Sequence, residues 1–279
     1  MASQIRINRL KKPLNIILVG AGRVGKCLAP WHRKDRDYVK LIRRCQRLPK
    51  INPDVLLFTT GDQDLVEAIK IWAGHLPVKK TRLVAHTSGI KGLEVLAPFS
   101  KRGERVAAIH PLFSFPENPQ RCKTKRLDKA FVSHLHSKGA LPTVKRLINT
   151  WSGTPLEITN KKHRELYHAA LSMASNQLTT LTALTTEMLE PFLGENASKA
   201  ISSISNQSLK NFAMDGAKKS LTGPIVRGDI DAVKRHWQIL PKKAKKIYQS
   251  LGFSTIELAL ASGRINSGQA RKLKHILRD

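Results

Sequence analysis

Long apolar runs are missing from this 279-residue sequence. The longest apolar stretches, such as 15–20 and 54–60, are far shorter than the roughly 20 residues that a membrane-spanning helix requires. The segment 1–13 is basic, but no apolar region of signal-peptide length follows it before Gly20. We therefore expect neither a membrane span nor export, and we expect the protein to be cytoplasmic.

Cysteine is also scarce. The three cysteines, Cys27, Cys45 and Cys122, are widely spaced and odd in number. This pattern fits neither a disulfide framework nor a paired-cysteine metal site. We therefore expect reduced thiols, as in a reducing cytoplasm.

Acidic residues are few, since 20 Asp and Glu stand against 49 Lys and Arg, which gives a net charge of +29. Such an excess is often a sign of nucleic-acid binding. Here the basic residues are spread from Arg6 to Arg278 and are not gathered into one tail or one stripe with interleaved aromatic residues. The distribution favours a solvated basic surface, and specific nucleic-acid binding is not expected.

Short apolar runs alternate with helix-compatible segments through the first half of the chain. The runs lie at 15–20, 38–42, 55–60, 82–86 and 106–110. This alternation is typical of βαβ units around a largely parallel sheet. A further strand at 130–135, a helix at 141–151 and a last strand at 156–159 complete the expected α/β domain.

The pattern changes after Thr159. From 161 to 190, apolar and small residues recur at helical spacing without a proline, and helical segments continue at 197–217, 230–251 and 254–279. The sequence therefore predicts two domains, an α/β domain over 1–160 and an all-α domain over 161–279.

A glycine-rich segment follows the first apolar run directly. Residues 20–25 read GAGRVG, and a helix-compatible segment comes next. In such a turn the first glycine permits the tight bend, the second lets the backbone approach a pyrophosphate, and the third lets helix pack on strand. Amide groups at the start of the helix face the phosphates. In this context the motif predicts a Rossmann dinucleotide-binding domain rather than an incidental glycine turn.

The end of the second expected strand distinguishes the two nicotinamide cofactors. An NAD site would carry Asp or Glu there, whereas this chain has Arg43 and Arg44. Guanidinium groups suit a 2′-phosphate, so we predict NADP(H), although arginine is abundant enough throughout the chain to occur there by chance. The residues expected to bind the cofactor are Gly20, Gly22, Arg23, Val24, Gly25, Arg43, Arg44 and Thr60.

Two polar positions end neighbouring strands of the expected sheet, Ser88 after the fourth run and His110 after the fifth. Both therefore fall beside the nicotinamide side of the crevice. A carbonyl or imine that accepts a hydride must also receive a proton, and histidine is a suitable donor. We predict a catalytic role for His110, with Ser88 orienting the ring or the substrate; a structural histidine is the alternative.

The long helix after 161 carries a polar stripe that includes Lys162, His168 and Asn176. Burying such groups unpaired is costly, so they either satisfy one another or meet a ligand. We favour the ligand, with His168 and Asn176 as catalytic candidates and Lys162 as a substrate contact. Arg227, in a compact loop, is a second candidate for a substrate carboxylate, or else part of a turn that caps the next helix.

The order of five segments resembles a known family. These segments are GAGRVG, HTSG, HPLFSF, YHAALSMASN and LTGPIVRGD. They resemble the Rossmann-like proteins with a helical C-terminal domain of unknown function, DUF2520, and the resemblance runs from residue 15 to about residue 260. That family is similar to the wider 6-phosphogluconate-dehydrogenase-like superfamily, which includes β-hydroxyacid dehydrogenases and pyrroline-5-carboxylate, ketopantoate and prephenate enzymes. The resemblance implies an NADP-dependent oxidoreductase.

The resemblance also implies residue roles. In prephenate dehydrogenases a similar strand-end serine precedes a catalytic histidine in an HP pair, which carries over to Ser88 and His110. In β-hydroxyacid dehydrogenases a lysine and an asparagine act on the first long C-terminal helix; Lys162 and Asn176 do not reproduce their spacing, and His168 is the candidate replacement for the lysine. Some similar proteins act as an alternative ketopantoate reductase in pantothenate synthesis. The resemblance therefore makes 2-dehydropantoate the leading candidate substrate and implies a homodimer formed through the helical domain. The alternatives are a reductase of another small keto acid or imine, and a protein that has the fold without the catalysis and senses NADP or binds nucleic acid.

Overall fold

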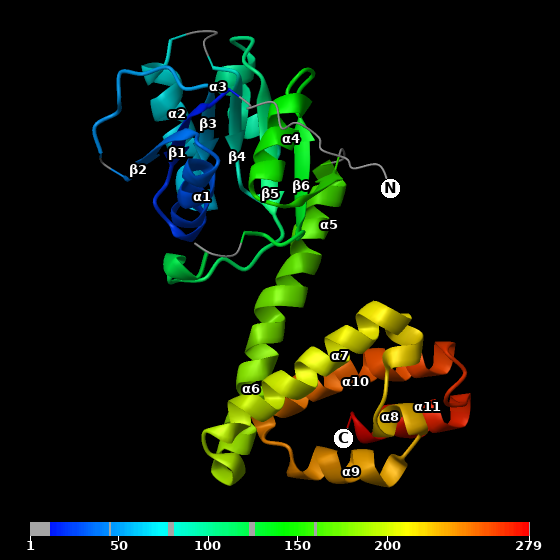
Figure 1. Cartoon of the computed structure of the whole chain (residues 1–279). Helices are drawn as coiled ribbons and strands as arrows, with labels where there is room; N and C mark the ends of the chain where they lie inside the picture. Colours follow the sequence, from blue (N-terminus) through cyan, green and yellow to red (C-terminus); the bar gives the residue numbers. More distant parts are fainter. Residues whose placement is uncertain (1–11, 45, 78–80, 123–125, 159–160, 279) are drawn as a thin grey trace, which may run out of the picture. The chain divides into compact units, whose positions relative to one another are not determined.

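The chain divides into two compact units, Met1–Ser175 and Asn176–Asp279. The computed structural model describes residues 12–44, 46–77, 81–122, 126–158 and 161–278, and it describes the side chains of 161 and 162 no further than their helical backbone (Figure 1). None of the described helices is long and apolar enough to cross a membrane.

The first unit, called here the sheet unit, is built on seven strands. In chain order they are β1 (Asn15–Val19), β2 (Tyr38–Ile42), β3 (Val55–Phe58), β4 (Leu83–His86), β5 (Val106–Pro111), β6 (Phe131–His136) and β7 (Thr154–Glu157). Their order across the sheet is β2-β1-β3-β4-β5-β6-β7. All neighbouring pairs are parallel except β5 and β6, which are antiparallel. The predicted largely parallel α/β domain is confirmed.

Helices cover both faces of this sheet. α1 (Arg23–Lys34) and α4 (Leu141–Thr150) pack on the face that carries Ile16 and Leu18, whereas α2 (Asp62–His75) and α3 (Ala97–Ser100) pack on the face that carries Ile17 and Val19. Side chains of a strand alternate between faces, so the near-continuous apolar runs of β1 and β3 are explained by burial on both sides. Burying each such leucine or isoleucine contributes roughly 1.5–3 kcal/mol.

Two cysteines meet in the core of the sheet unit. Cys27 of α1 and Cys122 of the 3₁₀ turn Pro119–Cys122 form a disulfide, with a Cα–Cα distance of 5.4 Å. The expectation of reduced thiols is therefore wrong for this pair. The two residues are 95 positions apart, and the packing that brings them together leaves no trace in cysteine spacing. Cys45 lies outside the described residues.

A long helical segment follows β7. It consists of α5 (Lys161–Ser172), a π-helical turn (Met173–Gln177) and α6 (Leu178–Leu193). The helix predicted from 161 to 190 is thus present, but one π turn interrupts it. The compact units divide inside that turn, so α5 belongs to the sheet unit, 15 residues beyond the boundary expected from the sequence.

The second unit, called here the helical unit, contains α6 and five further helices among its described residues. They are α7 (Asn196–Ser220), α8 (Pro224–Arg227), α9 (Ile230–Ile239), α10 (Lys242–Ala261) and α11 (Ser267–Ile276). Its core lies between α8, α9, α10 and α11, around Val233, Ile256 and Leu273. This confirms the predicted all-α second region.

Candidate functional site

The glycine turn between β1 and α1 has the backbone that a dinucleotide cradle requires. Gly20 has φ +114°, and a Cβ there would lie 2.7 Å from the backbone nitrogen of Thr60. A Cβ on Gly25 would overlap the Gly20 carbonyl oxygen and lie 2.7 Å from Thr59 Oγ1. Gly22, in contrast, faces open space. The first and third glycines therefore hold strand and helix together, and the second leaves room for a ligand.

The start of α1 offers free backbone donors. Gly22 is the N-cap residue and no side chain caps the helix, so the first N–H groups of Arg23, Val24 and Gly25 have no intrahelical partner. Such an end attracts phosphate through its amide groups and through the helix dipole. The predicted contacts at these residues stay predictions, but the backbone geometry fits a pyrophosphate.

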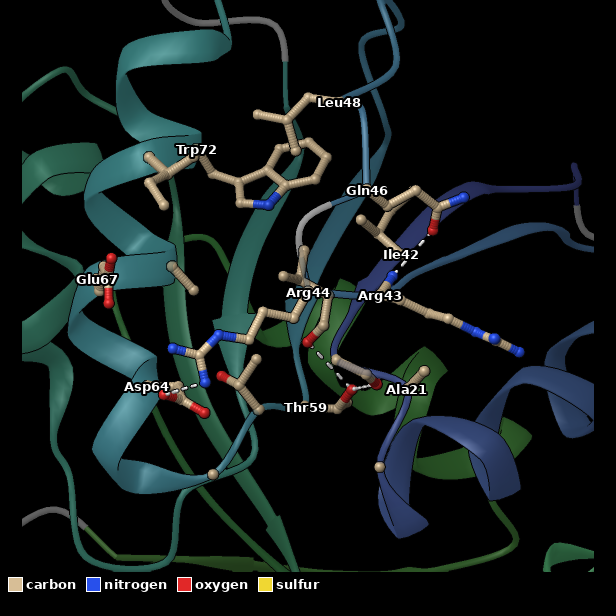
Figure 2. Close-up of a pocket in the computed structure, with 17 residues that line it drawn as sticks. Ala21, Ile42, Arg43, Arg44, Gln46, Leu48, Thr59, Asp64, Glu67 and Trp72 are labelled. Carbon is tan, nitrogen blue, oxygen red and sulfur yellow. Dashed lines mark hydrogen bonds and ion pairs between the residues drawn. The ribbon is translucent and has the colours of Figure 1, made fainter.

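Two threonines at the end of β3 border the turn. Thr59 Oγ1 donates a hydrogen bond to the carbonyl oxygen of Gly20 at 2.7 Å and so fixes the position of the turn (Figure 2). Thr60 Oγ1 is buried and has no hydrogen-bond partner within the described part of the chain. A buried hydroxyl without a partner is costly, so Thr60 Oγ1 is available to a ligand, and its predicted contact with the cofactor stays a prediction.

A cavity of about 490 Å³ opens beside this turn. Apolar side chains of Ile42, Leu48, Ala68 and Trp72 form one part of its wall (Figure 2). This volume lies within the range of small-molecule sites, and the apolar wall suits a flat ring such as adenine.

Arg43 and Arg44 line the same cavity directly after β2. Arg44 Nη1 lies 3.3 Å from Asp64 Oδ1 of α2, and Arg43 points away from that carboxylate in Figure 2. The side chain of Arg44 is 77% exposed, so its ion pair with Asp64 is weak and can be exchanged for a phosphate. The cavity thus holds two guanidinium groups for a 2′-phosphate and, on α2, an acidic group that the sequence reasoning did not include.

A second group of polar residues lies at the carboxyl ends of β4 and β5, with histidine at its base. His86 Nε2 lies 3.0 Å from the Gly92 carbonyl oxygen, and His86 Nδ1 accepts the Ser88 N–H at 3.2 Å. Burial lowers the pKa of His86 to about 4. Both nitrogens are occupied and the ring is neutral, so His86 shapes the loop that carries Ser88. Ser88 Oγ in turn accepts the Lys91 N–H at 3.0 Å.

His110 and His168 come together above this loop. Their ring centroids are 6.2 Å apart, and both rings pack on Gly89, where a Cβ would lie 2.5 Å from His168 Cδ2 and 3.0 Å from His110 Nε2. His110 Nδ1 also lies 3.1 Å from the hydroxyl of Tyr167 on α5. The structure thus groups His110 and His168, two of the predicted catalytic residues, and adds Tyr167, which sequence reasoning missed although it directly precedes His168.

Burial and nearby charge set the protonation states of this group. Burial, followed by the positive charge of Arg164, lowers the pKa of His110 to about 4. Burial raises the pKa of Tyr167, and the Ser133 hydroxyl opposes this effect. At neutral pH the group therefore consists of a neutral imidazole and a neutral phenol, joined by a hydrogen bond.

Arg164 is the second residue that the sequence reasoning missed. It is fully buried, and its guanidinium donates from Nη2 to the Ser88 carbonyl oxygen at 2.6 Å and from Nε to the Lys91 carbonyl oxygen at 2.9 Å. Its Nη1 has no hydrogen-bond partner among the described residues. Arg164 therefore ties α5 to the loop after β4, but in a chain with 49 Lys and Arg no pattern singles it out.

For the remaining predicted site residues, the structure shows the element on which each lies. Asn176 lies in the π-helical turn at the start of the helical unit, and π turns are frequent at functional sites. The side chain of Lys162 lies outside the described residues. Arg227 is exposed on α8, and Asp229 caps α9 by accepting the Ala232 N–H at 3.0 Å. The capping alternative is thus observed for Asp229, while the role of Arg227 stays a prediction.

Comparison with known proteins gives two domain matches. Residues 43–111 match the model of a Rossmann-like domain, and residues 132–255 match the model of the domain of unknown function DUF2520. No curated protein matches the sequence.

Solved structures share the fold along nearly the whole chain. An NADP oxidoreductase candidate from Bacteroides fragilis is 19% identical, with a TM-score of 0.69, and the match covers 88% of this chain and 98% of that one. A Plasmodium falciparum pyrroline carboxylate reductase with NADP bound is 12% identical, with a TM-score of 0.56 and coverage of 94% and 98%. An Aspergillus terreus reductive aminase in complex with NADPH and ethyl levulinate is 12% identical, with a TM-score of 0.57 and coverage of 95% and 93%.

Proposed function

We propose that this chain, which joins a Rossmann-like domain to a DUF2520 domain, is an NADPH-dependent reductase of a small keto acid or imine. One observation carries the proposal. The glycine turn after β1, Thr60 after β3, Ser88 after β4 and His110 near the end of β5 lie along the same carboxyl edge of a parallel sheet. In open α/β sheets this edge is where ligands bind.

The cradle described above would hold NADPH in two places. The free amide groups at the start of α1 and Thr60 Oγ1 suit the pyrophosphate, and Arg43 and Arg44 suit the 2′-phosphate. When bound, the cofactor supplies a hydride to the substrate.

The group formed by His110, His168 and Tyr167 would supply the proton that accompanies the hydride. His110 is neutral, so it acts as a hydrogen-bond partner that polarises the acceptor, with Nδ1 held by Tyr167 and Nε2 directed to the Gly89 side. His168, beside it, is the proposed proton donor. Arg164 is a positioning residue because it holds the loop on which both rings rest.

Electrostatics favour an anionic substrate. The charge of Arg164 acts at His110 strongly enough to be the second cause of its low pKa. The same field attracts a substrate carboxylate, with Lys162, Arg227 and Asn176 as the further proposed contacts. A short 2-keto acid suits these positively charged and polar side chains, and 2-dehydropantoate is the first candidate. The reductive aminase with bound ethyl levulinate, a keto ester, motivates the inclusion of imines.

The test measures NADPH binding by fluorescence titration and NADPH oxidation with 2-dehydropantoate, other short 2-keto acids and a cyclic imine. We expect turnover with at least one of them, and the variant His168→Ala should lose more than about 100-fold in kcat, as for removal of a proton donor. His163→Ala, on the exposed face of the same helix, is the matched control and should keep wild-type kcat.

Two outcomes would contradict the proposal. NADPH binding without turnover of any substrate would indicate a protein that senses the cofactor and does not catalyse a reaction. Steep salt-dependent duplex binding in competition with NADPH would favour the nucleic-acid alternative.

We also propose that the protein forms a homodimer through its helical unit. Large apolar side chains stand exposed on α6 and α7, with Phe192 81%, Ile204 65% and Phe212 56% exposed. Exposed large apolar side chains of this kind are typical of an interface, and a second copy of the chain would cover them. Light scattering on the purified protein measures the mass directly.

A further inference from the structure

Two histidines stand side by side on β6, on the face of the sheet away from His110. His134 and His136 are two positions apart, so they project from the same face of the sheet, and their rings stack with centroids 5.5 Å apart. Glu157, the last residue of β7, is the register partner of His134. His110 pairs instead with Ser133, which alternates with His134. The cluster formed by His134, His136 and Glu157 therefore lies on the opposite sheet face from His110.

The spacing of this cluster is that of a metal site. One ring nitrogen of each histidine and a carboxylate oxygen of Glu157 all lie within 4.8 Å of one another, the only such group of three among the described histidine, cysteine and acidic residues. His136 Nε2 and Glu157 Oε1 are 3.5 Å apart. Tetrahedral ligands at bond lengths of about 2.0–2.2 Å stand about 3.3–3.6 Å apart. The His136–Glu157 pair already has this spacing, and the His134 nitrogen, within 4.8 Å of both, would move toward them to bind the same ion.

The donor atoms are available for a ligand. His136 Nδ1 lies 3.1 Å from the Ser137 carbonyl oxygen and donates its proton there, which leaves Nε2 with a free lone pair toward Glu157. A metal-bound histidine usually donates its other ring N–H to a carbonyl or carboxylate oxygen in this way, and the bond fixes the orientation of the ring. His134 is only 4% exposed, and its Nδ1 is buried with no hydrogen-bond partner in the described chain. Burial also lowers the pKa of His134, which favours the neutral imidazole that metals bind.

We propose that His134, His136 and Glu157 bind one divalent transition-metal ion, with zinc as the reference metal. Two imidazoles and one carboxylate suit zinc and its neighbours, whereas magnesium and calcium require oxygen ligands. Glu157 is half-exposed, so water completes the coordination on its side. The ion would link the end of the edge strand β7 to β6 and so stabilise the last strand before α5, the helix that carries Arg164 and Tyr167.

One neighbouring charge opposes the ion and provides a control. Burial is the largest cause of the lowered pKa of His134, and the positive charge of Lys145 on α4 adds a smaller effect in the same direction. Its ammonium group would repel a cation, so Lys145→Gln should tighten zinc binding, while a neutral ligand would not respond to this change.

The experiment uses the full chain, stripped with a chelator and titrated with Zn²⁺ by calorimetry and with Co²⁺ by visible absorption. We expect one ion per chain, a rise in Tm on zinc addition, and a loss of more than about tenfold in affinity in each of His134→Ala, His136→Ala and Glu157→Gln. Glu157→Gln keeps the shape of a half-exposed side chain, so its fold is retained even if a histidine variant fails to fold. His236→Ala, on an exposed histidine of α9, should bind zinc as the wild type does.

The reductase site has its own histidines and must be separated from this one. His168→Ala should keep the zinc affinity and the Tm rise of the wild type. If zinc binding is instead lost in His168→Ala and retained in His136→Ala, or if Glu157→Gln leaves the affinity unchanged, the proposal is overturned.

Discussion

The sheet unit covers its apolar surface from both sides, whereas the helical unit leaves much of its own exposed. Leu56 and Leu57 of β3 point to opposite faces of the sheet, and both are fully buried. On the described helices of the second unit, Phe192, Met214 and Ile239 are 81%, 83% and 83% exposed. The buried core that the described residues of this unit form lies in the helices from α8 onward.

This contrast indicates where each unit obtains its stability. A sheet covered on both faces contributes its own core, so its polar residues can be held in fixed positions at the strand ends. A unit with large exposed apolar side chains gains from a partner surface. Substitutions in the sheet unit should therefore act on folding and cofactor binding, and substitutions on the exposed helical faces should act on assembly.

Among single substitutions, the largest effect is expected at the glycine turn. In Gly25→Ala the added Cβ would overlap the Gly20 carbonyl oxygen, which is backbone and cannot move aside cheaply. We expect a loss of about 3 kcal/mol or more in the free energy of unfolding, together with loss of NADPH binding. Urea unfolding and fluorescence titration measure the two quantities.

Two other glycines separate folding from binding at this position. Gly22→Ala meets no atom within 4 Å, so it should unfold like the wild type and yet lose NADPH affinity. Gly74→Ala, in α2 and equally unobstructed, should leave the NADPH affinity unchanged and raise the free energy of unfolding by about 1 kcal/mol or less, because alanine favours a helix more than glycine does. Equal NADPH affinity in Gly22→Ala and in the wild type would argue against the cradle.

The next effect is a pH dependence of the sheet unit. His86 and His110 have pKa values near 4 in the folded protein, whereas a histidine in an unfolded chain titrates near 6.5. Between these values the unfolded chain binds protons that the folded chain does not bind. Stability should therefore fall as the pH decreases from about 6.5 to about 4, by up to about 3 kcal/mol for each histidine, and these two residues should add no slope above that window.

Tryptophan fluorescence can assign this loss to one unit. Trp31, Trp72 and Trp151 are buried in the sheet unit, and Trp237 belongs to the helical unit. In a Trp237→Phe background, urea unfolding at pH 7 and pH 5 reports on the sheet unit alone. The difference between the two pH values should shrink in His86→Gln and persist in His236→Gln, which changes an exposed histidine.

The sequence predicts the parts of this fold that depend on neighbours along the chain. The apolar runs locate the strands to within one or two residues, and the GAGRVG turn lies between β1 and α1 as its spacing indicates. His110 and His168 were both candidates because each occupies a position with a defined place in the fold, a strand end and a helix face.

The features that the sequence could not predict depend on contacts across the chain. Arg164 is recognisable only once its bonds to Ser88 and Lys91 are seen, because its burial decides its role. The Cys27–Cys122 disulfide and the pairing of Glu157 with His134 join segments whose distance in sequence carries no signal. The π turn that contains Asn176 likewise has no distinct apolar period.

The two arginines of the proposed cofactor cavity should have unequal effects on NADPH binding. Arg43 points away from Asp64, whereas Arg44 is shared with that carboxylate. Arg43→Ala should therefore weaken NADPH binding by about 10-fold to 100-fold, the value of one charge-assisted hydrogen bond, and Arg44→Ala by less. NADH affinity should change little in either variant. If NADPH and NADH bind the wild type equally, neither arginine recognises the 2′-phosphate.

Phe212→Glu should have the smallest effect on the free energy of unfolding and should nevertheless separate the proposed dimer into monomers. Phe212 is 56% exposed on α7, so Phe212→Glu should alter the unfolding free energy of a single chain by less than about 0.5 kcal/mol. In a dimer built on this face the same change buries an unpaired carboxylate, and the mass measured by light scattering should fall by half. Ile51→Glu, at a similarly exposed apolar residue of the sheet unit, should leave the mass unchanged. A dimer that persists in Phe212→Glu and separates in Ile51→Glu would reverse the contrast between the units, because the sheet unit would then be the one that needs a partner.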